Sequence, residues 1–563
     1  MGEIKNVCLI DGPQLLATAF DKLGCDVLRL AGSGGAVLDL GEALARAREG
    51  RGFVPDLVVQ IESLGRRCLL AGLDSLACPA MLWCMDPHLN GYWHAPYARL
   101  FDLTCSSQRA AIPALAGRGA ADVRWLPTFG LSSPSPAHGQ RTRDVAFVGR
   151  QSAARPGRTW MVRLLERSCA GHVLTVTEGL SFGAMLDLYR DARIVPNESI
   201  LDEVNFRLFE GASCGCLVLG QDLGEEQASL FEPGREFDTY ADGVELVEKL
   251  GLYLKNPRLT QAMGQAGRAR VLAEHTVRHR AQRILEYGRD ATDLRARGRE
   301  ADIWLALTVA TMWEAGMFGG SAREVLARLA GGAGAIDLTV SPEMVCAAMR
   351  VQAMAGMTAP LATTVDSLLA AGLWEDSAEA NLTGSMAALR LGRFDAAKSF
   401  WYRHIRNTGI KNPGPPGSPD DLRILWARNA ARRGAVIRSG FAFDPATHLP
   451  ASASECLLAV LNDRPEDPPI MRLLDTMLRP LPGYSQLRVG LLSSLTLRER
   501  DDWRLTLDLA LANLRSYRVE PGLEELAMAQ RLAKSQGQER AFARALAAAD
   551  RSGLLAARLA PAG

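Results

Sequence analysis

The chain has 563 residues, 48% of them hydrophobic, which leaves room for three or four domains with well-filled cores. The formal net charge is +1, so charge gives no argument for binding to nucleic acid or to an anionic membrane. No apolar run approaches the roughly 20 residues that a membrane span needs. The 11 scattered cysteines and an N-terminus without a cleavable apolar segment predict reduced thiols in a cytoplasmic protein.

Residues 1–140 alternate short apolar runs with helical periodicity, the pattern of a parallel sheet wrapped by helices. A stretch rich in Ser, Pro and Gly, residues 131–143, is interpreted as a linker to a second domain of the same kind, residues 141–290. Two consecutive open α/β domains predict a ligand-binding cleft between their sheet ends. The strands are expected at 7–10, 26–30, 57–60, 80–84, 102–105, 123–126, 144–149, 173–177, 193–196, 217–219 and 236–238.

After a charged segment, residues 289–302, the rest of the chain reads as helices separated by Gly and Pro. Four glycines at expected helix ends are spaced by 40, 36 and 42 residues, near the period of helix–turn–helix arrays: Gly316, Gly356, Gly392 and Gly434. Residues 378–402 resemble a tetratricopeptide (TPR) unit, so 303–450 is predicted to be a TPR-like helical repeat domain. A generic helical domain is the alternative. Residues 451–563 read as a further helical region without visible period.

The strongest functional signal lies between residues 193 and 231. A short apolar strand ends in a polar loop with Asn197, and a helix then opens that carries Arg207 and Glu210. Such a junction at the carboxyl end of a strand presents free backbone N–H groups and a positive dipole end, which suit a phosphate. Arg207 adds a cationic fork for a diphosphate, and Glu210 is placed to accept hydrogen bonds from ribose hydroxyls.

This segment resembles the donor-binding core of GT-B glycosyltransferases, which has two acidic residues separated by seven others. Asp202 and Glu210 have that spacing, with Asp where Glu is usual. The closer likeness is to the CgeB-like, group 1 glycosyltransferases, whose pattern is matched by Asn205, Arg207, Phe209, Glu210 and Gly215. The resemblance covers 140–290 well and 1–140 loosely. It implies a GT-B fold, two Rossmann-like domains facing a cleft, with an acceptor-side first domain, a nucleotide-sugar-binding second domain and no cofactor.

Glycosyl transfer needs stabilisation of the departing nucleotide diphosphate and a group that takes the proton of the acceptor. No Asp-x-Asp metal motif occurs in the chain, so the expected mechanism is metal-free. Arg207 and Asn205 are the candidates for stabilising the diphosphate. Gly149 and Arg150, after the first strand of the second domain, are expected to assist them.

Candidates for the base follow a buried strand in the first domain, where Asp86, His88 and His94 stand among aromatic residues. A carboxylate at the carboxyl end of a strand is placed to take an acceptor proton, and CgeB-like proteins often have an Asp after a Trp-bearing strand here. Asp86 is therefore the predicted base, although a turn opener would look the same. His94 is the second candidate and Asp11, after the first strand, the third.

The leading hypothesis is a nucleotide-sugar-dependent, metal-independent glycosyltransferase acting on a protein, such as flagellin or another surface protein, or on a surface glycan. Tandem helical repeats form concave peptide-binding surfaces, so the helical region is expected to hold the acceptor. Two alternatives stay open. One is a nucleotide-sugar epimerase with the GT-B fold, and the other is a non-catalytic, degenerate transferase that serves as a repeat-based adaptor.

Overall fold

The computed structural model describes residues 3–32, 34–63, 65, 67–132, 141–153, 155–331, 335–409 and 414–559. The chain divides into two compact units, residues 1–127 with 281–470 and residues 128–280 with 471–563. Most of the predicted linker, residues 133–140, lies outside the described residues. Among the helices described, none combines the length and the apolar character that crossing a membrane requires.

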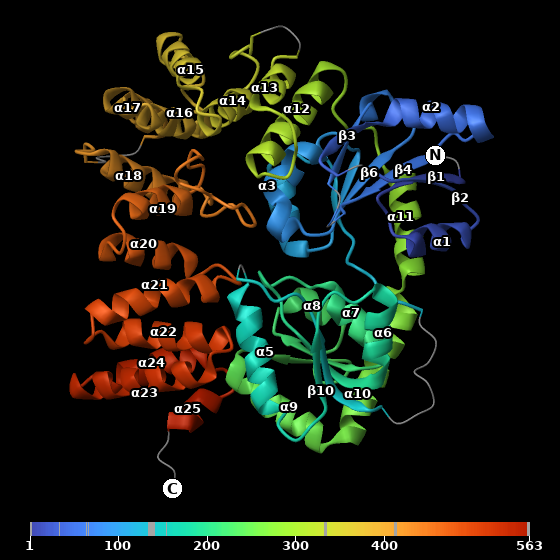
Figure 1. The fold of residues 1–563 in the computed structure, drawn as a ribbon, viewed down its shortest axis with the longest axis vertical. Coiled ribbons are helices and arrows are strands. Elements are labelled where there is room, and N and C mark those ends of the chain that lie inside the picture. The colour runs from blue at the N-terminus through green and yellow to red at the C-terminus, as the bar shows by residue number, and fades with distance from the viewer. Residues whose placement is uncertain are drawn as a thin grey trace. The chain divides into compact units, whose positions relative to one another are not determined.

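The first unit contains a six-stranded parallel sheet in the order β2-β1-β4-β6-β7-β8 (Figure 1). Its strands are β1 Asn6–Ile10, β2 Asp26–Leu30, β4 Leu57–Ile61, β6 Ala80–Cys84, β7 Leu103–Ser106 and β8 Val123–Trp125. The helices between them are α1 Gln14–Asp21, α2 Leu40–Arg51, α3 Pro87–Ala98 and α4 Ile112–Gly117. All six predicted strands are confirmed.

A second, two-stranded parallel sheet in this unit was missed by the sequence reading. It pairs β3 Ala36–Asp39 with β5 Cys68–Ala71. Each strand has only four residues, and its partner lies about thirty residues away in the chain. Runs this short carry little periodicity, and their pairing is decided by contacts that are not local.

The helical part of the first unit follows α11 Val277–Asp290. It comprises α12 Arg299–Glu314, α13 Ala322–Leu329, α14 Pro342–Met354, α15 Thr358–Ala370, α16 Ala378–Arg390, α17 Phe394–Thr408, α18 Pro419–Arg432 and α19 Ala453–Asp463. Helix α20 Pro468–Leu478 begins in this unit and belongs to the second unit from Met471 onward. The four predicted helix-ending glycines follow α12, α14, α16 and α18 with φ of 68°, 67°, 71° and 80°. Glycine adopts this left-handed conformation without a Cβ penalty, and it ends a helix. The helix–turn–helix pattern is confirmed, and the TPR class stays a prediction.

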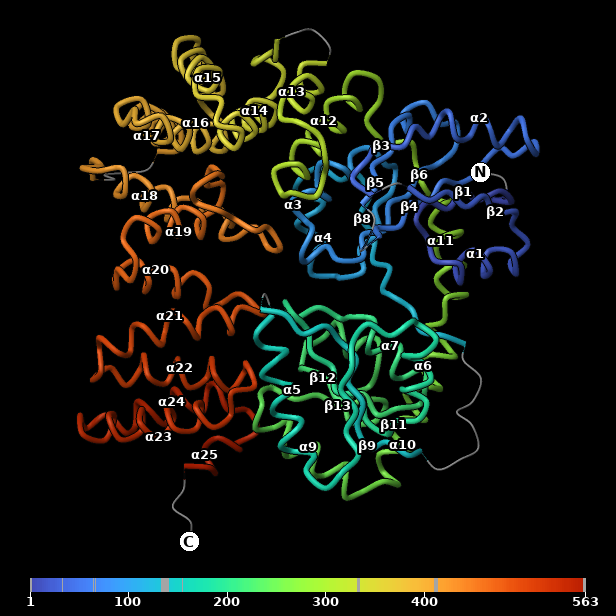
Figure 2. The backbone as a smooth tube through the Cα atoms, viewed as in Figure 1, coloured from blue at the N-terminus to red at the C-terminus, as the bar shows by residue number. Residues whose placement is uncertain are grey.

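Sheet and helices of the first unit share one hydrophobic core. Leu82 of β6 and Trp93 of α3 belong to the same buried cluster as Leu305 and Met312 of α12 and Val351 of α14. Helix α12 packs directly on α3, as the backbone trace shows (Figure 2). The start of the helical region is therefore a structural part of the unit that holds the first sheet.

The second unit contains a five-stranded parallel sheet in the order β10-β9-β11-β12-β13. Its strands are β9 Arg143–Val148, β10 Leu174–Thr177, β11 Ala192–Asn197, β12 Leu217–Gln221 and β13 Asp238–Tyr240. The helices are α5 Pro156–Ser168, α6 Phe182–Asp191, α7 Phe206–Ser213, α8 Glu225–Leu230, α9 Gly243–Lys255 and α10 Pro257–Arg270. The last strand begins two residues later than predicted, because Glu236 still lies in a turn and donates its N–H to the carbonyl of Glu232 at 2.9 Å.

The C-terminal helices also belong to the second unit. They are α21 Ser485–Arg498, α22 Trp503–Arg515, α23 Val519–Ser535, α24 Glu539–Ala549 and α25 Leu554–Leu559. Tyr517 joins the hydrophobic core of the second sheet, and its hydroxyl lies 3.0 Å from that of Tyr240. Val244 of α9 packs with Trp503 and Leu514. These helices complete the core of the unit instead of forming a separate appendage.

Candidate functional site

The predicted junction between strand and helix is present where β11 ends and α7 begins. Asn205 is the N-cap of α7, and its Oδ1 accepts the N–H of Arg207 at 3.2 Å. Its Nδ2 donates to the carbonyl of Glu198 at 3.1 Å, which ties the cap to the end of the strand. Asn is among the preferred N-cap residues because its side chain pairs an N–H that has no partner within the helix. The junction thus has the geometry of an anion site at a helix N-terminus.

Arg207 holds three chain segments together at this junction. Its Nη1 donates to Asn197 Oδ1 at 3.0 Å and to the carbonyl of Glu198 at 3.4 Å, and its Nη2 donates to the carbonyl of Val148 at 3.0 Å. A Cβ at Gly149 would lie 3.2 Å from Nη2, so glycine leaves the guanidinium room there. The structure therefore brings Asn197, Gly149 and Arg207 together, and Arg207 shapes the site as well as charging it.

Glu210 lies one helical turn after Arg207 on α7. Burial raises the pKa of its carboxyl to about 7, although the positive charge of Arg207 acts to lower it. A carboxyl that titrates near neutral pH beside a helix N-terminus is typical of functional sites, where perturbed pKa values gather.

A buried ion pair that the sequence reading missed supports the same loop. Glu198 Oε2 lies 2.9 Å from Nε and 2.7 Å from Nη2 of Arg158, which comes from α5. Nη1 of Arg158 also donates to the carbonyl of Arg150 at 3.3 Å, while the Arg150 side chain itself is exposed. The pair fixes the loops after β9 and β11 relative to one another. The only sequence signal was an acidic residue directly after a buried strand.

Asp202 has a left-handed backbone, with φ of 56°, and it is exposed. It lines a pocket of about 400 Å³ between the loops that follow β11, β12 and β13 and the C-terminal helices. Gln221, Tyr240 and Arg515 line the same pocket. Neither Arg207 nor Glu210 does. The two acidic residues of the predicted motif therefore face different surroundings.

In the first unit, Asp86 is the N-cap of α3 at the carboxyl end of β6. Its N–H and that of Met85 donate to Oε2 of Glu62 at 2.8 and 2.7 Å, and Nδ2 of Asn90 donates to Oε1 at 2.5 Å. The Glu62 carboxylate, which follows β4, therefore holds the first turn of α3 in place. Sequence reasoning missed Glu62, although it directly follows the wholly buried strand β4.

His94 lies inside the first unit and not on its surface. Its side chain is 0% exposed, and Nε2 lies 3.1 Å from Oε2 of Glu62. Burial raises the pKa of Glu62, but the nearby His94 and the hydrogen bonds from Met85 and Asp86 outweigh it, so the pKa lies below its ordinary value. Of the two candidate bases, His94 is buried against Glu62, whereas Asp86 lies at the carboxyl end of the sheet. Asp11, the third candidate, accepts the N–H of Gly32 at 2.9 Å from a left-handed turn with φ of 55°.

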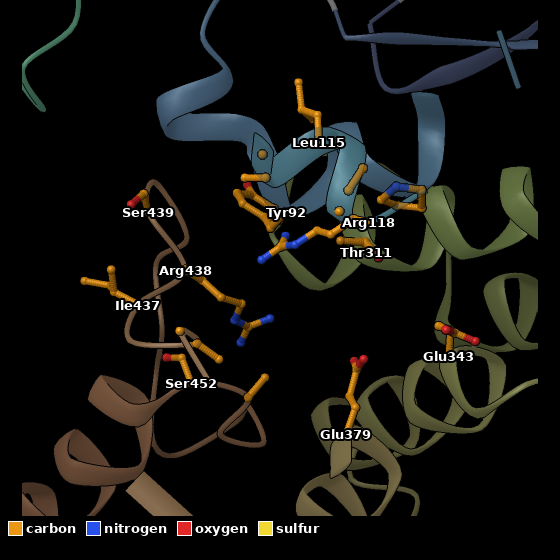
Figure 3. A pocket seen from close by; sticks show the side chains of 18 of the residues that line it. Tyr92, Leu115, Arg118, Thr311, Glu343, Glu379, Ile437, Arg438, Ser439 and Ser452 are labelled. Carbon is orange, nitrogen blue, oxygen red and sulfur yellow. The ribbon is translucent and has the colours of Figure 1, made fainter. Parts of the chain in front are cut away.

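A second pocket, of about 580 Å³, lies wholly within the first unit (Figure 3). Pro87 and His88, the residues that follow Asp86, line it, and so do residues of α4, α12, α14 and α16. No group of three or more His, Cys, Asp or Glu side chains suited to a metal ion occurs in the part of the chain that the structure describes.

Comparison with known proteins gives one match to a family model. Residues 146–286 match the family described as glycosyl transferase-like, and this range contains the whole α7 junction. No curated protein matches the chain. The family match confirms the predicted enzyme class, a glycosyltransferase.

Solved structures give low overall similarity. The Anabaena protein HepE, solved in complex with UDP-glucose, is 15% identical, covers 51% of this chain and 99% of its own, and gives a TM-score of 0.37. Sucrose-phosphate synthase from Thermosynechococcus elongatus is 13% identical, covers 51% of this chain and 98% of its own, and gives 0.36. A glycosyltransferase from Rickettsia africae is 9% identical, covers 51% and 99%, and gives 0.38. TM-scores this low support no assignment of this chain. The assignment rests on the family match: residues 146–286 are a glycosyltransferase-like domain.

Proposed function

We propose that the protein is a metal-independent GT-B glycosyltransferase of the CgeB-like type, and that its donor is a nucleotide-diphosphate sugar. The observation that carries the proposal is the position of the family match. Residues 146–286 contain Asn197, Asn205, Arg207 and Glu210, which the structure gathers at the start of α7. Fold, charge and sequence pattern thus support the same segment as the donor site.

The donor's diphosphate is expected to lie at the start of α7. Free N–H groups of the first turn and the positive charge of Arg207 stabilise the negative charge of the leaving group. Glu210, as a carboxylate, accepts hydrogen bonds from ribose hydroxyls. Because Gly149 has no Cβ, the backbone there leaves space beside the Arg207 guanidinium. UDP-sugars are the first donors to test, since the Anabaena neighbour was solved with UDP-glucose.

Asp86 is the proposed base. During transfer, an acceptor oxygen forms a bond to the anomeric carbon, the bond from that carbon to the diphosphate breaks, and the acceptor proton passes to the Asp86 carboxylate. Glu62 positions Asp86 through the backbone of α3. The helical region from α12 to α19, which belongs to the same unit, is proposed to hold a protein or surface-glycan acceptor in the cytoplasm.

The donor site is tested by titrating UDP and UDP-glucose, with and without EDTA, and following thermal unfolding. A ligand that binds only the folded protein raises the melting temperature. Arg207→Ala should weaken affinity roughly tenfold or more, since hydrogen bonds to charged groups contribute about 1.5–3 kcal/mol. The control is Arg258→Ala, an exposed residue of α10. Equal affinity in the two variants removes Arg207 from the site, and loss of binding or transfer in EDTA removes metal independence.

The chemistry is tested separately at Asp86. Asp86→Asn should keep donor affinity and lower turnover by roughly 10²-fold or more, the scale of lost general-base catalysis. An unchanged turnover assigns the base to another residue.

A further inference from the structure

The pocket of about 580 Å³ in the first unit has the size of a small-molecule site. One wall is the face of α3 that begins at Pro87, together with α4, and the other is formed by α12, α14, α16 and the segment 433–439. Figure 3 shows Arg118 and Arg438 reaching into the space from different elements. Nothing in the proposed donor site uses this pocket.

Two of its arginines are already neutralised by the protein. Arg350 lies 3.4 Å from Glu314 and 3.3 Å from Glu379. Arg438 lies 3.2 Å from Glu314 and 2.6 Å from Glu455. Glu314 and Glu455 are each only 4% exposed, so this network is buried and holds the helical wall together. Its charges do not require a ligand.

The other three lining arginines form no ion pair with a carboxylate among the described residues. The side chain of Arg118, after α4, is exposed. Arg433, after α18, donates from Nε to Oδ1 of Asn429 at 3.0 Å, and this neutral amide does not balance its charge. Arg99 stacks on Trp304 at 3.9 Å and donates to the carbonyl of Arg118, which fixes the backbone there. The pocket therefore has an excess of positive charge that is not paired within the protein.

The rest of the lining suits a molecule with many hydroxyls. The rings of Tyr92 and Trp304 line the pocket, and Arg99 covers one face of Trp304. The hydroxyl of Thr311 donates to the carbonyl of Leu307 at 2.8 Å, so it faces a ligand as an acceptor. Glu343 on α14 has no basic partner among the described residues, and its carboxylate is free to accept hydrogen bonds. Planar faces beside mixed hydrogen-bonding groups match the CH faces and hydroxyls of a sugar ring.

We propose that this pocket is the acceptor site and takes an anionic saccharide, whose carboxylate or phosphate groups pair with Arg118 and with Arg433. A guanidinium binds either group through two parallel hydrogen bonds. The assignment as acceptor site rests on the proposed function, because the pocket begins at the two residues that follow the proposed base. A peptide acceptor would not need two unpaired guanidinium groups beside sugar-like contacts.

Isothermal titration calorimetry on the full chain tests this proposal with trigalacturonic acid, glucose 6-phosphate and neutral maltotriose. The two anionic probes distinguish a carboxylate from a phosphate. At least one anionic probe should bind roughly tenfold or more tightly than maltotriose. Arg118→Gln and Arg433→Gln should each weaken it roughly tenfold, the loss of one charge-assisted contact. The matched control is Arg432→Gln, an exposed neighbour on α18 that does not line the pocket.

Three results overturn the proposal: no anionic probe binds, maltotriose binds as tightly, or the pocket variants bind like the Arg432→Gln control. UDP affinity, measured on the same proteins, separates the two proposals. Unchanged UDP binding with lost saccharide binding supports both. A third outcome is that the wild-type chain binds the saccharide but no nucleotide, and the pocket variants do not bind the saccharide. The pocket is then a saccharide site, and the glycosyltransferase proposal is wrong.

Discussion

Replacing Glu62 by Gln tests whether one buried carboxylate holds the proposed base in place. In the folded chain Glu62 accepts two backbone N–H groups, contacts His94 at 3.1 Å and accepts from Asn90. The glutamine side chain keeps the shape and one carbonyl oxygen, but it removes the charge facing His94 and directs an amide group at one of the former donors. The first turn of α3, and with it Asp86, then loses its anchor.

Leaving a buried donor without its acceptor costs about 1–3 kcal/mol, and more where the lost acceptor was charged. We expect about 3 kcal/mol for this variant because the amide oxygen still pairs some donors, and at roughly 2 °C per kcal/mol the melting temperature falls by roughly 6 °C. The pKa of Glu62 in the folded chain lies below its ordinary value. Its contribution is therefore present above the unfolded pKa and is lost as pH falls through the folded pKa, so the difference between variant and wild type shrinks in acid.

Thermal unfolding followed by circular dichroism, from pH 7.5 down to pH 4, measures this difference. Amide hydrogen exchange of the peptide 83–98 reports the loosening of α3 directly. Glu49→Gln is the matched control, since Glu49 is exposed on α2. If Glu62→Gln melts within about 1 °C of the control and α3 exchanges no faster, Glu62 does not anchor the helix, and the positioning argument for Asp86 is wrong.

Two further predictions concern the second unit. Because the pKa of Glu210 is raised to about 7 in the folded chain, its charging costs stability as pH rises toward 7. Glu210→Gln should therefore stabilise the protein by about 2–3 kcal/mol at pH 8 and little at pH 5, which urea unfolding measures; equal effects at both values would contradict the assignment. A chain ending at Ile470 should lose the second unit's cooperative melting and its nucleotide binding, since it removes Tyr517 from the core of the second sheet. A truncated chain that binds UDP like the full chain would show that the core tolerates the loss.

The sequence alone was enough to predict the elements that depend on local pattern. Alternating apolar runs located eleven strands, and glycines at Gly316, Gly356, Gly392 and Gly434 marked helix ends, because periodicity and backbone conformation are properties of neighbouring residues. The α7 junction was predictable for the same reason. Asn205, which caps the helix by accepting the N–H of Arg207, lies within two helical turns of both Arg207 and Glu210.

Contacts between distant segments were decided only by the tertiary structure. Three contacting pairs are far apart along the chain: Glu62 and His94 by 32 residues, Glu198 and Arg158 by 40, and Tyr517 and Tyr240 by 277. Each of these pairs depends on how whole elements pack, and no local pattern in the chain records that. The division of the helical region between the two units has the same origin. Its helices look alike in sequence, and the apolar surface that each buries is specified by the shape of the partner face, which exists only once the sheets have formed.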